Sequence, residues 1–371
     1  MRKIGERALS GDTFRTKYLT IRISTYVLPF VRKPGSPNRV TSRDVAERAG
    51  VSQPTVSLVL SKNPTARISA ETRARILQAA EELRYSPNLV ARSLVRSRSF
   101  ALGIIVPDFR NPFFADVVSS AERVASQAGY AVLLCEAGEA NPARYLDALH
   151  ERVIDGVIID AVGASSVDSE LLDRTNVVLI DQIPGRWPGV ATDAESAGAQ
   201  AAEHLIELGH KRIAFIGPAI DSHAFRMRER GFFKRLTANG IPLPSEYLVR
   251  CNATAVDGRS AMRALLMQKP RPTAVFCVND VIAIGALKAC VAAKARVPQD
   301  ISIVGCDDIE LAQLVSPELT TIRVPAGELG ARAARLLIRA IEGEKEKKTT
   351  RLLPVSLVKR GTTATAPAEA S

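Results

Sequence analysis

The chain has 371 residues, 46% hydrophobic and 24% charged, which is typical of a globular protein with two or three domains. No uninterrupted apolar run reaches membrane-spanning length, so the sequence argues against an integral membrane protein and against a membrane partner. The five cysteines are scattered without C-x-x-C spacing. This pattern argues against a zinc site or a disulfide framework and favours reduced thiols in a cytoplasmic protein.

The net charge of +11 is concentrated at the N-terminal end. Residues 1–38 hold 8 Lys/Arg against 2 Asp/Glu, residues 39–100 hold 11 against 5, and the remainder holds 31 against 32. A basic N-terminal part on a neutral remainder predicts a polyanion partner for that part alone. Residues 1–38 make a poor signal peptide. They are either a disordered basic arm or the product of a start assigned too far upstream, and we favour the second because the helical pattern begins abruptly at Val40.

Residues 41–60, TSRDVAERAGVSQPTVSLVL, predict two short helices around a tight turn. Thr41 and Asp44 have capping-box spacing, and Gly50 stands where a positive φ is needed. Ser52 is a second N-cap, and Pro54 falls in the first helical turn, where its missing N–H costs nothing.

In the second helix, Val56, Val59 and Leu60 are expected to face the core. The outward residues are then Gln53, Pro54, Thr55, Ser57 and Leu58. This is the pattern of a helix-turn-helix, whose second helix enters the major groove of DNA. An ordinary helical hairpin is the alternative for these twenty residues alone.

Ser69 can cap a third helix, SAETRARILQAAEELRY, which would complete a three-helix headpiece. Residues 86–99, SPNLVARSLVRSRS, are too short for a stable isolated helix and are expected to become helical on DNA. There Leu94, followed by Arg96 and Arg98, could wedge into a minor-groove base step. The alternative is a flexible linker without a role in DNA contact.

From Phe100 onward, apolar strands alternate with amphipathic helices. The expected strands are 101–106, 130–135, 155–160, 176–181, 212–217, 273–278 and 301–306. This order predicts a parallel, doubly wound α/β fold in two lobes, with ligands at the carboxyl ends of the strands.

Polar residues occupy those strand ends, including Asp108, Asn111, Asp160, Asn279 and Asp307, with Phe109 beside them. Arg228 lies in a polar stretch that opens another helix. Carboxylates, an amide and a guanidinium near a Phe would suit a sugar or a nucleoside. Taken singly, each of these residues could instead be a helix cap or part of a surface ion pair.

With headpiece, hinge and two-lobed body in this order, the chain resembles the lactose/galactose-repressor (LacI/GalR) family. The resemblance covers about residues 40–361 and rests on VTSRDVAERAGVSQPTVSLVL, FRNPFF, VNDVIAIGAL, ISIVGCDD and LTTIRVP. It implies an all-α headpiece and hinge helix followed by an α/β, periplasmic-binding-protein-like effector domain. It also implies a homodimeric repressor that binds a palindromic DNA operator and a small, sugar-like effector, with no cofactor, no metal and no catalytic residue.

The expected division is an extension at 1–38, a headpiece at 39–85, a hinge at 86–99, an effector domain at 100–361 and a tail at 362–371. Position by position, the resemblance implies base contacts, phosphate contacts, hinge contacts and effector contacts. The base readers are Gln53, Pro54 and Leu58; the phosphate contacts are Thr55 and Ser57, with the caps Thr41 and Ser52 added; the hinge residues are Asn88, Ala91 and Leu94. The effector residues are Phe109, Asn111, Phe113, Phe114, Asp160, Arg228, Asn279 and Asp307.

Departures from the family pattern refine these expectations. Leu58 replaces a common Arg or His and Pro54 replaces a polar residue, so the operator should differ from the lactose type at those steps. Ala253 lies near the place of the indole that stacks the lactose repressor's inducer, and Val324 replaces a frequent polar contact. The effector is therefore not expected to be a simple β-galactoside. No leucine-heptad tail follows Thr363, which predicts a dimer.

Two other classes of protein fit the sequence less well. A solute-binding protein shares the two-lobed fold but would need an export signal and no headpiece. An enzyme would need a catalytic pattern, and no G-x-G-x-x-G, Walker loop or G-x-S-x-G occurs. The four histidines show no metal spacing, and His204 and His210 flank a helix end, which favours a capping role.

Overall fold

The computed structural model describes residues 40–60, 68–85, 98–137, 154–160, 172–173, 175–181, 187–220, 222–344 and 352–368. The chain divides into two compact units, residues 1–87 and residues 88–371, called here the headpiece and the body. The extension 1–38 and the hinge residues Asn88, Ala91 and Leu94 lie outside the described residues.

The headpiece contains three helices, α1 (Ser42–Ala49), α2 (Gln53–Leu60) and α3 (Ala70–Glu82). Each helix contributes small or β-branched apolar side chains to one core, which allows the short helices to approach closely. The buried residues are Val45, Ala46, Ala49, Val56, Val59, Ile76, Ala79 and Ala80. The expected three-helix headpiece is therefore present.

Local capping fixes the helix ends. The amide of Asp44 donates to Thr41 Oγ1 over 3.4 Å, while the Asp44 carboxylate accepts from the Thr41 amide over 2.7 Å, which completes the capping box. Gly50 ends α1 with φ of 65°, a conformation that a residue with a Cβ rarely adopts. Ser69 accepts from the Thr72 amide over 3.1 Å and caps α3.

The body has two lobes, each built on a six-stranded sheet. In lobe 1 the strand order is β11-β5-β4-β3-β1-β2, and every pairing is parallel. Its strands are β1 (Ala101–Val106), β2 (Ala131–Glu136), β3 (Gly156–Ile159), β4 (Val177–Ile180), β5 (Gly189–Thr192) and β11 (Leu352–Leu353).

In lobe 2 the strand order is β12-β10-β9-β8-β6-β7, and only the β10–β12 pairing is antiparallel. Its strands are β6 (Ile213–Pro218), β7 (Leu248–Cys251), β8 (Ala274–Cys277), β9 (Ser302–Asp307), β10 (Thr320–Arg323) and β12 (Ser356–Val358). All seven expected strands are found. Five strands were not expected (β5, β7, β10, β11 and β12). β11 has two residues and the other four carry a polar or charged side chain, so none gives the apolar run that predicted the equally short strands β3, β4 and β8.

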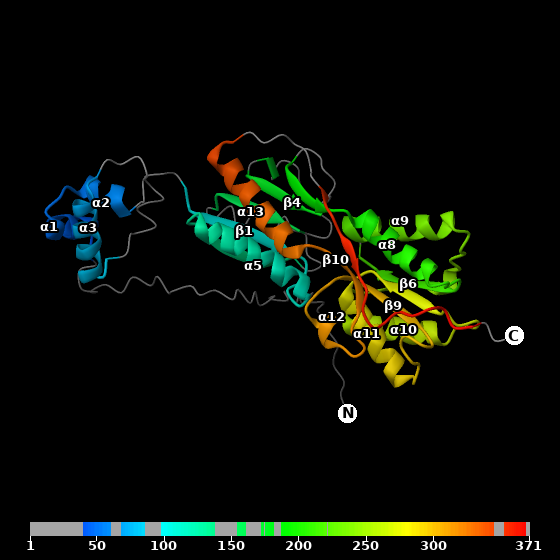
Figure 1. Cartoon of the computed structure of the whole chain (residues 1–371). Coiled ribbons are helices and arrows are strands. Elements are labelled where there is room, and N and C mark those ends of the chain that lie inside the picture. Colours follow the sequence, from blue (N-terminus) through cyan, green and yellow to red (C-terminus); the bar gives the residue numbers. More distant parts are fainter. Residues whose placement is uncertain are drawn as a thin grey trace, which may run out of the picture. The chain divides into compact units, whose positions relative to one another are not determined.

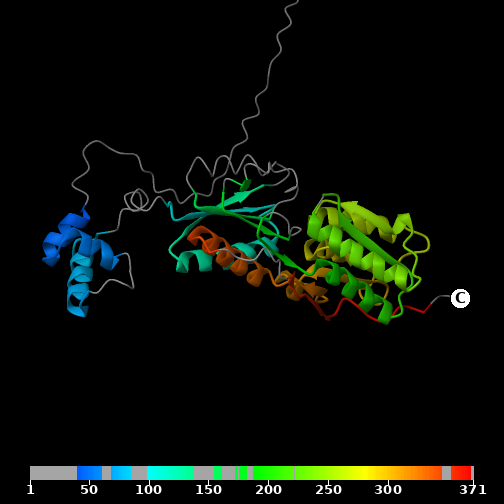
Figure 2. The same cartoon turned by 90° about the horizontal axis from the view of Figure 1, so that it is seen from above.

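The helices of the body pack in pairs on these sheets. They are α5 (Pro112–Gln127), α8 (Ala194–Glu207), α9 (His223–Ala238), α10 (Ala255–Leu266), α11 (Asp280–Ala292), α12 (Leu311–Leu314) and α13 (Ala326–Glu342), with a short 3₁₀ turn at Ser245–Tyr247. In lobe 2, α8 and α9 lie on one face of the sheet and α10 and α11 on the other (Figure 1). In lobe 1, α5 and α13 lie on the same face of the sheet (Figure 2).

Glycines allow these helix pairs to approach closely. A Cβ on Gly198 of α8 would lie 1.7 Å from the Arg228 carbonyl oxygen on α9, and one on Gly231 would lie 1.9 Å from the Glu195 carbonyl oxygen. The α10–α11 and α5–α13 pairs have glycines in the same role, at Gly285 and Gly330. The position of α9, which carries Arg228, therefore depends on the absence of a side chain on α8.

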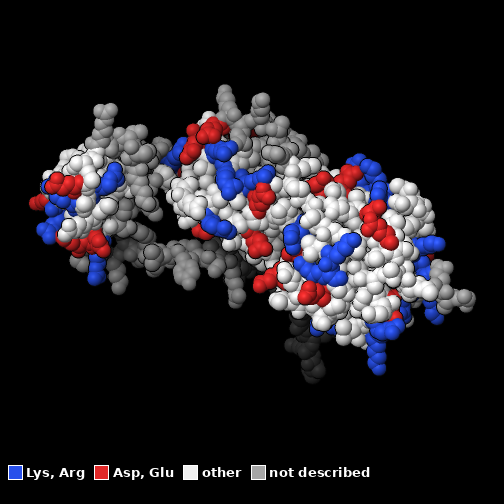
Figure 3. Space-filling view, in the orientation of Figure 1, with Lys and Arg blue, Asp and Glu red and all other residues white. Residues whose placement is uncertain are grey.

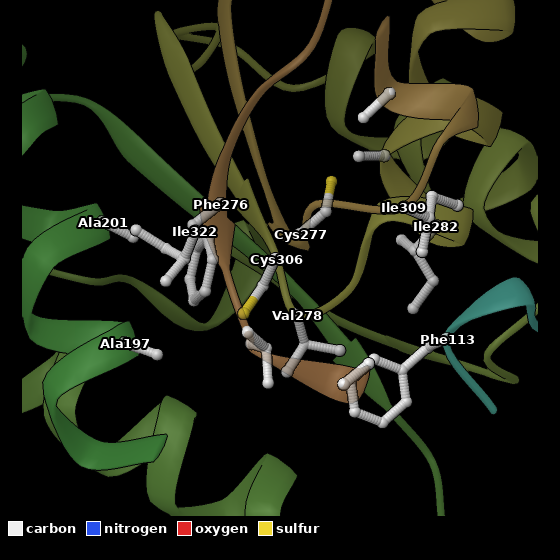
Figure 4. Packing of buried hydrophobic residues seen from close by; sticks show 14 of the residues in the cluster. Phe113, Ala197, Ala201, Phe276, Cys277, Val278, Ile282, Cys306, Ile309 and Ile322 are labelled. Atoms are coloured by element: carbon white, nitrogen blue, oxygen red, sulfur yellow. The ribbon is translucent and has the colours of Figure 1, made fainter. Parts of the chain in front are cut away.

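One hydrophobic cluster extends through both lobes. Phe113 of α5 belongs to the same cluster as Val278 and Ile309 of lobe 2, as Figure 4 shows from close by. The chain passes between the lobes three times: after β5, after β10, and between β11 and β12.

The C-terminal residues correct one expected boundary. We expected residues 362–371 to be a tail outside the domain, but Thr362 is fully buried and accepts from the Ile303 amide over 2.8 Å. The amide of Ala366 also donates to the Leu208 carbonyl oxygen over 2.8 Å. Residues 362–366 therefore belong to lobe 2, and the expected boundary at 361 lies too early. The sequence missed this because a short polar segment has no apolar pattern, and its attachment depends on hydrogen bonds to residues far away in the chain.

None of the described helices is both long enough and apolar enough to cross a membrane.

Candidate functional sites: an exposed helix face and a cavity between the lobes

The candidate nucleic-acid interface is the outer face of α2. Val56 and Val59 hold the inner face against α1 and α3, so the remaining side chains of the helix point away from the core. Gln53, Pro54, Ser57 and Leu58 are exposed, and Thr55 is half-buried. The structure thus places the expected base and phosphate contacts together on one helical face.

Polar contacts orient the start of this helix. Gln53 Nε2 donates to Ser42 Oγ over 2.9 Å, which joins α2 to the first residue of α1. The Ser52 and Thr55 hydroxyls lie 2.8 Å apart, and the Thr55 amide donates to Ser52 Oγ over 3.4 Å. Ser52 is therefore the N-cap that the sequence predicts. Thr41 is engaged as the cap of α1.

The candidate effector site is a cavity of about 290 Å³ between the two lobes of the body. Its volume is at the lower end of the range for small-molecule sites and suits a ligand the size of a monosaccharide or a nucleobase. Its walls come from the carboxyl ends of strands in both sheets, as expected for parallel α/β folds. The lining residues are Pro107, Asp108, Arg110, Asn111, Phe113, Phe114, Glu136, Asp160, Asp181, Ile220, Ser222, Ala224, Phe225, Arg228, Asn252, Ala253, Thr254 and Asp307.

Six of the eight expected effector residues line this cavity. They are Asn111, Phe113, Phe114, Asp160, Arg228 and Asp307. Phe109 does not line it and is 40% exposed. Asn279 does not line it either: its side chain is fully buried, and Oδ1 accepts from the Ile282 amide over 2.9 Å to cap α11.

The lobe 2 wall is dominated by a buried ion pair. Arg228, only 2% exposed, places its guanidinium 2.9 Å from Asp307 and donates to the Val278 carbonyl oxygen over 2.8 Å. Burial by itself lowers the pKa of Arg228, but Cys306, Asp307 and Asp181 together raise it above its ordinary value. Burial also raises the pKa of Asp307, and Arg228 offsets part of that rise. The pair presents both donors and acceptors to the cavity.

The lobe 1 wall combines aromatic rings with carboxylates. Asn111 caps α5 by accepting from the Phe113 amide over 3.1 Å, which places Phe113 and Phe114 at the cavity with their ring centroids 5.3 Å apart. Asp108 binds Arg110 through two contacts of 2.9 and 3.0 Å. Burial by itself raises the pKa of Asp108, but the hydrogen bonds from Arg110 outweigh it and leave this pKa below its ordinary value.

Two further carboxylates lie deeper in this wall. Asp181 Oδ1 accepts from both the amide and the hydroxyl of Thr192, over 2.7 and 2.9 Å. Burial, more than any other cause, raises the pKa of Asp181 and raises that of Asp160 much further. The charge of Asp181 adds to the rise at Asp160. These carboxyls are therefore costly to ionise while the cavity is empty.

Several lining residues were not predicted from sequence, among them Arg110, Glu136, Asp181 and Asn252. Glu136 and Asp181 follow the ends of expected strands, as Asp160 does, so the same positional rule could have identified them. Arg110 and Asn252 carried no such signal.

No histidine or cysteine is among the described residues that line this cavity. The side chains of His204 and His210 contact the C-terminal residues: His204 Nε2 lies 3.0 Å from Thr363 Oγ1, and His210 Nε2 lies 3.1 Å from the Ala364 carbonyl oxygen. His204 also lies in the last turn of α8, and the His210 amide donates to the Leu205 carbonyl oxygen at the end of that helix over 3.1 Å. All five cysteines are free thiols. Within the described ranges, no three or more His, Cys, Asp or Glu side chains are grouped to hold a metal ion.

Comparison with known proteins agrees with this geometry. The profile described as bacterial regulatory proteins, lacI family, matches residues 41–88, and that of a periplasmic binding protein-like domain matches residues 202–363. The HTH-type transcriptional repressor PurR of Erwinia tasmaniensis is 35% identical over 335 residues, which span 88% of this chain and 98% of that protein. The ribose operon repressor of Escherichia coli (strain K12) is 34% identical, over 86% of this chain and 99% of that protein.

A solved structure of the lac repressor dimer, bound to operator and the anti-inducer ONPF, matches with a TM-score of 0.76 and 31% identity. The match covers 88% of this chain and all of that one. The relatives are transcriptional repressors and not enzymes. The resemblance seen in the sequence is thereby confirmed, and the chain belongs to the lacI family of bacterial regulatory proteins.

Proposed function

We propose that this chain represses transcription as a homodimer, binding a palindromic operator through α2 and responding to a small polyhydroxylated effector in the cavity between the lobes. The observation that carries the proposal is the combination, in one chain, of an exposed polar helix face and a polar cavity. A solute-binding protein would not need the exposed helix face. No feature of the described cavity favours a catalytic role.

In this proposal Gln53, Pro54 and Leu58 contact base edges. Gln53 can pair with adenine, whereas Pro54 and Leu58 can make only apolar contacts, for example with a thymine methyl group. Thr55 and Ser57, with the caps Thr41 and Ser52, contact phosphates and fix the position of the headpiece on the duplex. Asn88, Ala91 and Leu94 contact the minor groove at the centre of the operator.

The basic charge that would attract DNA lies mostly beside the described helices. Residues 40–60 and 68–85 hold equal numbers of basic and acidic side chains, whereas Lys62, Arg67, Arg92 and Arg96 fall in the adjoining segments. On the face of the molecule in Figure 3, the coloured acidic and basic side chains are interspersed. We therefore propose that phosphate attraction comes mainly from residues 61–67 and from the hinge.

The body also has features that suit self-association. Val256, Met267, Val291 and Leu314, on or beside α10, α11 and α12, are each at least 69% exposed. Apolar side chains mark an interface where they gather into one patch. We propose that these four belong to the interface of a dimer. We place that dimer in the cytoplasm, the compartment where a repressor meets DNA.

The test is operator selection from a random duplex library with the full-length protein at physiological salt. Specific binding exceeds non-specific binding by about 10³–10⁷, so a palindromic motif should be enriched. Enrichment of no motif, with only salt-sensitive binding, would contradict the proposal.

A matched pair of variants tests the role of α2. Leu58→Arg adds two guanidinium donors that can bond O6 and N7 of a guanine. The selected base should therefore change at one position in each half-site of the operator. Leu77→Arg makes the same change on an exposed residue of α3, where Leu77 is 51% exposed, and should leave the motif unchanged. If both variants select the original operator, Leu58 does not contact bases.

A further inference from the structure

Carboxylates stand at the ends of four neighbouring strands in lobe 1. In the sheet order β4-β3-β1-β2, the strands are followed or ended by Asp181, Asp160, Asp108 and Glu136. Since these strands are parallel, the four carboxylates meet at one edge of the sheet, and all four line the cavity. Asp307 adds a fifth from lobe 2.

Two guanidinium groups line the same cavity, and both are already engaged. Arg110 binds Asp108 at the mouth, where its side chain is 80% exposed and water screens its charge. Arg228 binds Asp307 and the Val278 carbonyl oxygen. Among the described lining residues, Asp160 and Asp181 have no cation of their own.

Carboxyl groups are therefore in excess over cations around Asp160 and Asp181. Asp160 interacts with the charges of Asp181, Asp307 and Arg228, and the two carboxylates together outweigh the single guanidinium. Burial of a carboxylate without a cation is costly. Thr192 satisfies only Oδ1 of Asp181. The other carboxylate oxygen is available to a ligand.

An unused donor lies beside this excess of acceptors. Arg228 Nε is fully buried and, among the described atoms, has no hydrogen-bond partner. Buried donors normally have an acceptor, so the ligand is expected to bring an oxygen to this nitrogen. A hydroxyl or ring oxygen would do this without adding negative charge.

These features restrict the chemistry of the ligand. The cavity has five carboxyl groups against two arginines, which does not favour an anion such as a sugar phosphate. A neutral sugar would satisfy Arg228 Nε but bring no cation to Asp160 and Asp181. A ligand with both hydroxyl groups and a protonated amine would do both, and the rings of Phe113 and Phe114 would favour its cation further.

We propose that the effector is a small polyhydroxylated ammonium ion, such as an amino sugar, whose ammonium group binds between Asp160 and Asp181 while a hydroxyl oxygen accepts from Arg228 Nε. The inference rests on the proposed function of the same cavity and names the class of ligand that the cavity selects.

The test compares matched sugars by isothermal titration calorimetry on the full-length protein at pH 6.5, where amino sugars are protonated. The probes are glucosamine, galactosamine and mannosamine, each with its parent hexose and its N-acetyl derivative. A charge-assisted hydrogen bond is about twice as strong as a neutral one. At least one amino sugar should therefore bind about tenfold more tightly than both of its neutral counterparts.

Two variants locate the effect. Asp160→Asn keeps the shape of the side chain but removes its charge, so the preference for the amine over the parent hexose should fall to within about threefold. Asp116→Asn makes the same change on an exposed residue of α5 outside the cavity and should keep the full preference. Thermal unfolding confirms that both variants are folded. If Asp160→Asn does not fold, the affinities of the wild-type protein for the amine, the hexose and the N-acetyl derivative still test the proposal.

Proton release is a second readout. The pKa of Asp160 is raised in the empty cavity by burial first and then by Asp181 and Asp307, with Arg228 opposing. An arriving ammonium ion would favour the ionised form, so binding should release a proton. The calorimetric enthalpy should then depend on the ionisation enthalpy of the buffer.

The proposal is overturned if a hexose, an N-acetyl derivative or glucose 6-phosphate binds as tightly as every amino sugar, or if no amino sugar binds. Operator selection is scored separately. A protein that selects an operator and releases it with a neutral sugar would retain the proposed function and refute only the ammonium ligand.

Discussion

Asp308 is buried directly behind the cavity residue Asp307 and pairs with two arginines. Arg323, at the end of β10, lies 2.7 Å from one carboxylate oxygen, and Arg360, just after β12, lies 2.5 Å from the other. Arg323 stands where the chain leaves lobe 2 after β10, whereas Arg360 follows β12 within lobe 2. One carboxylate thus joins the start of one crossing and the segment after β12 to the strand that supplies Asp307.

The burial of the two arginines predicts unequal contributions to stability. The Arg360 side chain is 9% exposed and also donates to the Leu319 carbonyl oxygen, so Arg360→Ala should lower the free energy of unfolding by about 3 kcal/mol. The Arg323 side chain is 56% exposed, so Arg323→Ala should cost about 0.5 kcal/mol. Urea unfolding measures both. Equal losses would show that burial does not set the strength of these pairs.

His204 predicts a pH dependence at the level of one residue. Burial first, and then the charges of Lys359 and His210, lower the pKa of His204 to about 4, whereas an unfolded histidine titrates near 6.5. The unfolded chain therefore binds more protons between these values. The contribution of His204 to stability is complete above about pH 6.5 and is lost as the pH falls toward 4.

The His204→Gln variant isolates this contribution from the carboxylates that titrate in the same range. Gln can still contact Thr363 but does not titrate. Between pH 7.5 and pH 5, the wild-type protein should lose about 2 kcal/mol of stability relative to the variant. Denaturant unfolding of both proteins at the two pH values measures the difference. A constant difference would mean that His204 titrates normally in the folded protein.

At the scale of elements, the α8–α9 crossing determines where Arg228 stands. A Cβ added at Gly198 would meet the backbone of Arg228 itself, so Gly198→Ala must push α9 away from α8. Overpacking of this kind costs about 1–3 kcal/mol. We expect the variant to lose that much stability and to bind effector more weakly, because the guanidinium moves with its helix.

Gly327→Ala is the matched control. Gly327 lies in the first turn of α13, where the nearest atom to an added Cβ is the Ser120 hydroxyl oxygen at 3.1 Å, on a side chain that can move. The control should be as stable as the wild type or more stable, since Ala is the better helix former. If Gly198→Ala and Gly327→Ala have the same stability and the same effector affinity, the close approach of α8 and α9 does not determine the position of Arg228.

At the scale of the whole molecule, the C-terminal residues hold lobe 2 together. Thr362 donates to the Ile303 carbonyl oxygen over 2.6 Å and accepts from the Thr320 amide over 2.8 Å, while the Ala364 amide donates to Ser302 over 3.1 Å. The C-terminal segment therefore joins the strands β9 and β10 of the lobe 2 sheet.

Deletion of residues 362–371 removes these bonds together with those of Ala366. At about 1 kcal/mol for each hydrogen bond, the loss should reach about 4 kcal/mol or more and lower the melting temperature strongly. Deletion of residues 368–371 alone should have little effect, because the bonded residues remain. Calorimetry of the two truncated proteins tests this. If the two truncated proteins have the same melting temperature, residues 362–367 do not stabilise lobe 2, and the domain boundary lies at residue 361 as the sequence predicted.

The sequence by itself determined the features that depend on neighbouring residues. The caps Thr41, Ser52 and Ser69, the turn at Gly50 and the inner face of α2 follow from short-range spacing, and so do the seven strands that were expected from their apolar runs. The positions of Asn111, Asp160 and Asp307 at strand ends followed from the parallel α/β plan. These features were predictable because a cap or a strand pattern is complete within a few residues.

Only the tertiary structure decided which of these residues share a site. It brought Arg228 of α9 to Asp307 at the end of β9, added Glu136 and Asp181 to the cavity, and left Phe109 and Asn279 outside its walls. It also joined residues 362–366 to lobe 2. Such outcomes depend on how closely helices pack and which strands pair, and these long-range contacts leave no periodic pattern in the sequence.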